Sequence, residues 1–139
     1  SEELNLHCLG LTTVPLFLLR ELPNLKKLDL SYNLLTSFSF TAGTLTALQD
    51  LDLHSNKLTS FIVTPGTLPA LQDLDLSSNR LTTFSATPGA FPALMILNLY
   101  ENQLTSFTIT PGALPALITL SLFNNQLHEL PLSLQDCRL

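Results

Sequence analysis

Residues 48–58 read Leu-Gln-Asp-Leu-Asp-Leu-His-Ser-Asn-Lys-Leu, and this stretch returns along the chain with the same spacing of leucine and asparagine. The copies lie at residues 25–35, 71–81, 94–104 and 117–127, so each begins 23 residues after the one before. Residues 1–24 form a degenerate first copy, in which Leu9 stands at the asparagine position. Self-similarity at a fixed period of this length is typical of a solenoid built from stacked coils.

The frame Leu-x-x-Leu-x-Leu-x-x-Asn-x-Leu resembles the signature of leucine-rich-repeat proteins and covers nearly the whole chain in about six repeats. The resemblance implies an α/β-type repeat solenoid, a curved horseshoe with a parallel β-sheet on its concave face. On the convex side we expect short extended segments, turns and few helices. We interpret residues 1–139 as a single domain with a degenerate first repeat at 1–24, four regular repeats at 25–116 and a last, capping repeat at 117–139.

Within each copy, leucines two residues apart predict a strand with one buried side. Leu51 and Leu53 point to the same side of such a strand, and the polar residues around them point to the other. Asn56 follows the strand, where its short amide can satisfy backbone groups of the turn and of the neighbouring coil. We therefore interpret the five repeated asparagines as structural: Asn33, Asn56, Asn79, Asn102 and Asn125.

The second half of each repeat predicts an extended segment followed by a turn. A phenylalanine and, two positions later, an apolar residue follow the asparagine, which indicates a short extended piece with a buried aromatic spine. Thr-Pro-Gly at 64–66, 87–89 and 110–112 suits a type II turn, because proline presets φ and glycine accepts a positive φ. Residues 15–24 contain no glycine, and their pattern favours a helical turn or two.

Composition and charge restrict the class of protein and of partner. Hydrophobic residues make up 45% of the 139 residues and charged residues 12%, a balance opposite to that of disordered chains. The net charge is −5 and the isoelectric point about 4.9, so we expect a protein partner with a basic patch and no nucleic acid. No apolar stretch has the length of a membrane span, so we expect no membrane insertion. Cys8 and Cys137 lie near opposite ends of the chain, which favours free thiols and an intracellular location, with a secreted effector as the alternative.

The exposed side of the predicted sheet combines an acidic centre with an aromatic end. Positions one repeat apart lie on adjacent strands, about 4.8 Å from each other. Carboxylates and a histidine gather on the middle strands: Asp50, Asp52, His54, Asp73 and Asp75. Large apolar side chains gather towards the C-terminal end, with two further residues in the column beside them: Ile96, Tyr100, Phe123, Glu101 and Tyr32. Aromatic anchors and steering charges are typical of protein interfaces, so these ten residues form the predicted partner-binding set.

We therefore predict a non-catalytic protein–protein interaction module that binds a macromolecular partner through its concave sheet face. Other classes of function have less support in the sequence. Nucleophile-elbow, phosphate-loop and zinc-protease motifs are absent and the histidines are scattered, so we predict no enzyme activity and no cofactor. The carboxylate grid offers oxygen ligands for Ca²⁺, so a Ca²⁺-binding surface is an alternative, although flat sheets rarely supply six or more ligands and no residue is predicted as a metal ligand. Regular threonine ladders leave a sugar- or ice-binding surface as an alternative.

The closing segment at residues 120–134 is similar to the last repeat of bacterial effector proteins, some of which carry a ubiquitin-ligase domain. That resemblance implies the substrate-recognition part of a larger effector or ligase. The 23-residue period and the Thr-Pro-Gly turns depart from the shorter, proline-rich repeats of those effectors. Because neither end carries a full cap, we also expect end-to-end self-association through exposed sheet edges.

Overall fold

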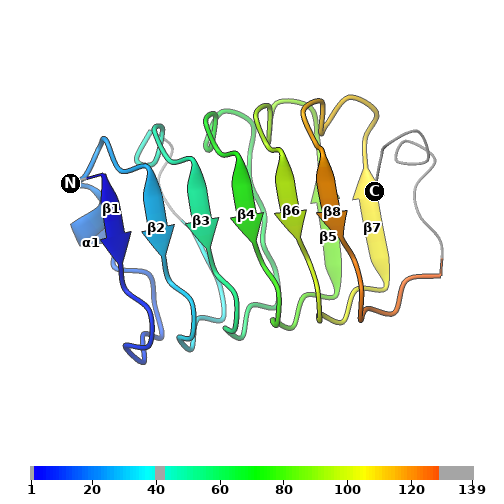
Figure 1. The fold of residues 1–139 in the computed structure, drawn as a ribbon, viewed down its shortest axis with the longest axis horizontal. Helices are drawn as coiled ribbons and strands as arrows, with labels where there is room; N and C mark the ends of the chain where they lie inside the picture. The colour runs from blue at the N-terminus through cyan, green and yellow to red at the C-terminus, as the bar shows by residue number, and fades with distance from the viewer. Residues whose placement is uncertain (1, 40–42, 129–139) are drawn as a thin grey trace.

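A computed structural model describes residues 2–39 and 43–128, in which successive coils stack side by side. Each coil contributes one three-residue strand to a parallel sheet, in the order β1-β2-β3-β4-β6-β8 (Figure 1). The strands are Glu3–Asn5 (β1), Lys27–Asp29 (β2), Asp50–Asp52 (β3), Asp73–Asp75 (β4), Ile96–Asn98 (β6) and Thr119–Ser121 (β8). The register pairs equivalent positions of neighbouring repeats, as the sequence period predicts.

The leucines form one continuous core behind the sheet. Leu51 of β3 and Leu74 of β4 are Cα partners across the ladder, and both side chains are fully buried. Leu53 and Leu76, two residues further on, are equally buried. The alternation therefore places leucine in the core and the intervening polar side chains on the concave face, as predicted.

The repeated asparagines bind backbone groups of their own coil and of the preceding one. Asn56 Nδ2 donates to the carbonyls of Leu53 at 3.0 Å and of Leu30 at 2.9 Å. Its Oδ1 accepts from the backbone N–H of Leu35 at 3.0 Å. The ladder starts at Asn33, whose Oδ1 accepts from both Leu9 and Leu11 of the first coil. The structural interpretation of these asparagines is thereby confirmed.

A left-handed residue precedes each ladder asparagine. Among the described residues, six non-glycine residues have φ between 53° and 58°: Cys8, Tyr32, Ser55, Ser78, Glu101 and Asn124. This conformation costs an L-residue roughly 1–2 kcal/mol. It recurs once per coil because the chain must leave the strand sharply to bring the asparagine amide under the sheet.

The convex side is built from extended segments and turns. Strands β5 (Thr83–Ala86) and β7 (Ser106–Ile109) pair in parallel behind the main sheet (Figure 1). The rings of Phe84 and Phe107 stack at 5.6 Å between centroids and are buried, so the predicted aromatic spine is confirmed. In the turn before the next strand, Thr67 N donates to Thr64 O at 3.3 Å and Gly66 has φ 85°, as a type II turn requires.

The first coil differs from the others, as its sequence predicts. Helix α1 (Leu16–Leu19) replaces the extended convex segment and buries Leu19 against the core. No helix in residues 2–39 and 43–128 has the length and hydrophobicity needed to cross a bilayer. The predicted free thiol of Cys137 and residues 129–139 of the predicted capping repeat lie outside the described residues.

Candidate ligand-binding face

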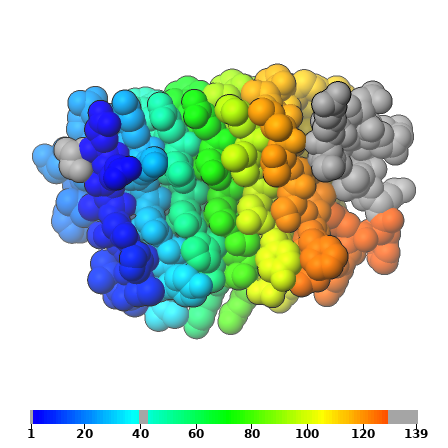
Figure 2. Space-filling model, viewed as in Figure 1, coloured from blue at the N-terminus to red at the C-terminus, as the bar shows by residue number. Residues whose placement is uncertain are grey.

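The concave sheet presents a broad, open surface on which the ten predicted partner-binding residues lie. Figure 2 shows this face, with the coils succeeding one another from the N-terminal to the C-terminal side. Register across the ladder sets the neighbours: Asp50 lies opposite Asp73, and Asp73 lies opposite Ile96. The face therefore changes from carboxylate to apolar within one strand spacing, between β4 and β6.

Asp50 and Asp73 form the electrostatically unfavourable centre of this face. Burial raises the pKa of Asp73 above its ordinary value, and repulsion from Asp50, Asp75 and Asp52 raises it further. Burial also raises the pKa of Asp50, although the Lys27 ammonium partly offsets the effect. Like charges on directly opposed positions of adjacent strands destabilise a sheet, so these two carboxylates are held where an external donor would relieve them.

Asp52 and Asp75 also form hydrogen bonds that stabilise the turns after their strands. Asp75 Oδ1 accepts from the backbone N–H of Ser77 at 2.9 Å and from its hydroxyl at 2.6 Å. Asp52 Oδ1 accepts from the backbone N–H of His54 at 3.0 Å. These bonds close the turns at the ends of β3 and β4. From the sequence we predict only a solvated or partner-binding role for this column. The Asp/Asn-x-polar spacing at the ends of β1 to β4, from Asn5 to Ser77, is the sequence signal for the turn.

Asp29 shows the electrostatic consequence of that turn. Burial raises the pKa of Asp29, but hydrogen bonds from the Ser31 side chain and backbone, together with His7, outweigh it. The pKa of Asp29 therefore lies below its ordinary value, opposite to that of Asp50 and Asp73. Asp29 thus differs in proton affinity from Asp50 and Asp73 because it accepts hydrogen bonds from turn donors.

His54 contacts its own strand, β3, and the turn that follows β2. Its Nδ1 is 2.6 Å from Asp52 Oδ1, and its ring meets the Tyr32 ring edge-on at 4.8 Å. Tyr32 itself is 58% exposed and left-handed, at the turn after β2. The two predicted residues are therefore in contact, which the sequence columns alone did not indicate.

The C-terminal end of the face carries a stacked aromatic pair. The Tyr100 and Phe123 rings are parallel within 4°, with centroids 6.1 Å apart, and Phe123 is 72% exposed. The Tyr100 hydroxyl accepts from Asn124 Nδ2 at 3.2 Å, which fixes the ring. Glu101 lies beside them and accepts from the Ser78 hydroxyl at 2.9 Å. Ile96, at 40% exposure, completes the apolar end.

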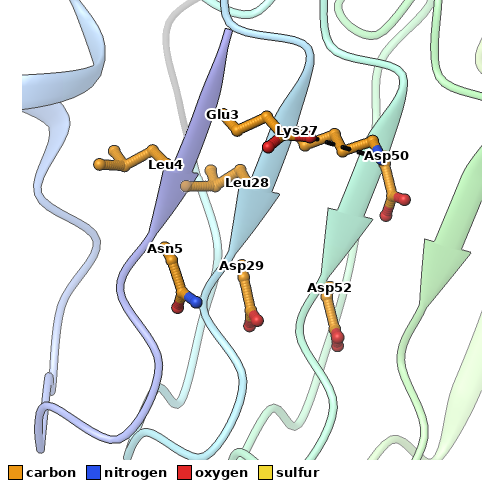
Figure 3. A pocket seen from close by; sticks show the side chains of 8 residues that line it. All are labelled: Glu3, Leu4, Asn5, Lys27, Leu28, Asp29, Asp50 and Asp52. Carbon is orange, nitrogen blue, oxygen red and sulfur yellow. Dashed lines mark ion pairs between the residues drawn. The ribbon is translucent and has the colours of Figure 1, made fainter. Parts of the chain in front are cut away.

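A shallow hollow on the N-terminal strands was missed by the sequence analysis. It measures about 450 Å³ and is lined by Glu3, Leu4, Asn5, Lys27, Leu28, Asp29, Asp50 and Asp52 (Figure 3). Lys27 crosses it, forms an ion pair with Glu3 at 3.5 Å and extends towards Asp50 (Figure 3). The lining residues come from the three adjacent strands β1, β2 and β3, so the hollow depends on neighbours across strands.

Comparisons with known proteins agree with this geometry. Two descriptions of the family match the chain, "Leucine Rich repeats (2 copies)" over residues 23–66 and "Leucine rich repeat" over residues 69–127. A comparison with curated protein sequences gave no match. Solved structures that resemble the chain include the crystal structure of the TLR13–ssRNA13 complex, with a TM-score of 0.59 and 26% sequence identity. That match covers 93% of this chain and 22% of the other, so this chain spans less than a quarter of its length.

The expectation of no nucleic acid among the partners is wrong. It rested on the net charge of −5, whereas the TLR13 structure of similar fold is that of a complex with single-stranded RNA. Net charge is a poor guide because local patches, stacking and single contacts decide whether a surface accepts a nucleic acid.

The two family matches agree with the predicted repeat frame. Together the matched segments cover more than half of the chain. The chain belongs to the leucine-rich-repeat family.

Proposed function

We propose that this chain is a recognition module that binds a protein ligand on its concave face. Leucine-rich repeats typically serve as non-catalytic modules that bind proteins or other ligands. The observation that carries the proposal is the exposed, parallel Tyr100–Phe123 pair one strand away from the carboxylates of β4. Exposed aromatic anchors bordered by polar groups are typical of energetically important interface centres.

The proposed contacts divide into two parts. Tyr100, Phe123 and Ile96 supply apolar area, and their rigid rings lose little conformational entropy on binding. Asp50, Asp73 and the free oxygens of Asp52 and Asp75 supply acceptors for ligand donors. Ligand donors at Asp50 and Asp73 also relieve the mutual repulsion that raises the pKa of Asp73. Tyr32, His54 and Glu101 border these two regions.

Single-stranded RNA is the second candidate ligand, and the TLR13 likeness favours it. Bases stack on exposed aromatic side chains with little dependence on sequence, and stacking contributes about 1–3 kcal/mol per base. The Tyr100–Phe123 pair offers such a platform, whereas the central carboxylates repel phosphates. RNA would therefore lie across the C-terminal strands rather than along the whole face.

Site-specific photo-crosslinking tests both candidates. A photoreactive phenylalanine is placed at Phe123 on the concave face or, as the matched control, at Ile62, which is 78% exposed and lies on the convex side. Crosslinked adducts from a cell extract are then treated with protease or ribonuclease. Adducts at position 123 that Tyr100→Ala weakens and that ribonuclease leaves intact support a protein ligand. Ribonuclease-sensitive adducts support RNA, and adducts confined to position 62 overturn the concave-face proposal.

A further inference from the structure

The sheet brings one histidine between two carboxylates of adjacent strands. Asp52 ends β3, His54 lies in the turn after it, and Asp75 ends β4. One donor atom from each of the three lies within 4.8 Å of the other two, and all three side chains are half-buried. The Cα atoms of Asp52 and Asp75 are partners in the ladder, so the backbone itself sets the spacing of the carboxylates.

Hydrogen bonds and a ring contact restrict the orientation of each of these side chains. Asp75 Oδ1 is held by the Ser77 backbone and hydroxyl. Asp52 Oδ1 is held by the His54 backbone, and the Tyr32 ring supports the imidazole edge-on. No donor among residues 2–39 and 43–128 reaches Oδ2 of either aspartate. Such second contacts are what fix ligand side chains in metal sites.

The repeats provide internal comparisons for this set. At the equivalent positions of β1 and β2 the chain has Asn5, His7 and Asp29, with an amide in place of the first carboxylate. Over β2–β3 and over β4–β6, serine replaces the histidine, as Ser31 and Ser77. Within the described sheet, a histidine flanked by two aspartates therefore occurs at β3–β4 alone. His7 Nδ1 lies 3.6 Å from Asp29 Oδ2, which shows that a histidine at this position reaches the aspartate of the next strand.

We propose that Asp52, His54 and Asp75 bind a divalent transition-metal ion of the zinc class. Imidazole nitrogen with carboxylate oxygen is a ligand set that suits zinc, whereas calcium takes six to eight oxygens. At metal–ligand distances of about 2.1 Å, tetrahedral ligand atoms lie about 3.4 Å apart. To reach that spacing, the Asp75 side chain has to rotate towards the other two, and the Asp52 and His54 side chains, whose Oδ1 and Nδ1 atoms are 2.6 Å apart, have to move apart around the ion.

A bound dication would also change the electrostatics of the whole acidic centre. Asp50 and Asp73 lie two residues before Asp52 and Asp75 on the same strands. Their carboxylates repel one another and those of the proposed ligands. A positive charge between β3 and β4 offsets this repulsion. Three protein ligands leave a fourth position open to water or to a donor from another molecule. The site does not require the proposed protein or RNA ligand.

Calorimetric titration of the full chain with zinc sulfate tests the proposal. The background carries Cys8→Ser and Cys137→Ser, so that thiolates do not contribute. We expect one ion per chain and a loss of affinity of about tenfold or more in His54→Gln and in Asp75→Asn. His7→Gln is the matched control and should leave the affinity unchanged, because its set lacks the first carboxylate. Urea unfolding of each variant separates loss of the site from loss of the fold.

A gain of function provides the second measurement. Asn5→Asp completes the equivalent set with His7 and Asp29, so the stoichiometry should rise from one to two ions per chain. The proposal is overturned if no zinc binds, if His54→Gln binds as tightly as the parent, or if calcium binds as tightly as zinc.

Discussion

Asparagine and aspartate side chains form hydrogen bonds with backbone groups that the three-residue strands do not pair. Asn98 Oδ1 accepts from Tyr100 N at 3.0 Å, the same turn that Asp52 and Asp75 close in their coils. Because asparagine suffices there, the negative charge of the aspartates is not required for the turn. Their charge is thus available for a ligand or a metal, whereas one carboxylate oxygen of each is committed to the fold.

Removing a ladder amide should destabilise the fold strongly. Asn79 is buried, donates to the carbonyls of Leu53 and Leu76, and accepts from Leu58 N. Asn79→Ala leaves these groups without partners, so we expect a loss of about 3 kcal/mol in the free energy of unfolding. Urea denaturation followed by circular dichroism measures it. Arg80→Ala, an exposed neighbour, should change stability little, and a cost below about 1 kcal/mol for Asn79→Ala would contradict the ladder interpretation.

The pH dependence of stability should distinguish Asp73 from Asp29. A raised folded-state pKa at Asp73 means that the native state binds more protons than the unfolded state. Stability therefore falls as pH rises from the unfolded-state pKa of about 3.9 through the folded-state value. Asp73→Asn removes this penalty and should stabilise the chain by about 0.5 kcal/mol at neutral pH, with no gain in acid.

Asp29→Asn provides the opposite case. Its pKa is lowered, so its stabilising contribution is present above the unfolded-state pKa and is lost as pH falls through the folded-state value. This substitution should therefore reduce stability slightly at neutral pH. Urea midpoints in buffer containing a chelator measure both variants, and equal pH profiles for the two would show that Asp29 and Asp73 do not differ in this way.

At the scale of the element, three-residue strands owe their stability to register and to the turns that follow. Each described coil has a left-handed residue at the same position after its strand, and three coils have a positive-φ glycine directly after a convex proline, at Gly66, Gly89 and Gly112. The coils differ in how closely these turns approach one another. A Cβ built on Gly89 would lie 3.3 Å from Pro65 Cβ, whereas one on Gly66 meets nothing within 4 Å.

This difference predicts unequal costs for the same substitution. Both glycines have φ near 85°, so alanine at either is strained by roughly 1 kcal/mol. Gly89→Ala adds a close contact with the neighbouring turn and should cost more than Gly66→Ala. Thermal unfolding of the two variants compares them directly. An equal loss would mean that the turns separate without cost.

At the scale of the whole molecule, stability depends on how many neighbours a coil has. Coil β3 packs between two others, whereas β1 pairs with β2 alone among the described strands. The partial exposure of Leu4 and Leu6 contrasts with the full burial of Leu51 and Leu53. In a quasi-one-dimensional fold, opening at an end breaks one interface and opening in the middle breaks two.

Hydrogen exchange should report this gradient. Leu6 N donates to Asp29 O at 2.8 Å and Leu53 N donates to Asp75 O at 2.9 Å, so the local bonds are alike. We expect the Leu53 amide to exchange about tenfold or more slowly than the Leu6 amide, because its opening free energy includes both interfaces. Amide exchange followed by nuclear magnetic resonance measures both sites. Equal rates would indicate that the chain unfolds as one cooperative unit.

By itself, the sequence determined the solenoid, the asparagine ladder, the phenylalanine spine, the proline–glycine turns and the helical first coil. It could do so because the 23-residue period along the chain is also the offset of contacts between coils, from Leu51↔Leu74 to Phe84↔Phe107. A pattern in one dimension therefore specifies the packing in three. The same period placed the ten candidate residues on or beside one face.

Only the tertiary structure decided which of those residues are free, paired or strained. Asp52 accepts a hydrogen bond from the backbone of the turn that follows it. Asp73 is partly buried and lies near other carboxylates, and His54 contacts Tyr32 from another coil. These states depend on side-chain rotamers and on neighbours from adjacent strands, which vary although the repeat frame does not. The net charge of −5 likewise led to the wrong expectation that nucleic acids are not among the partners. A ligand meets the local arrangement of atoms on the concave face, and only folding creates that arrangement.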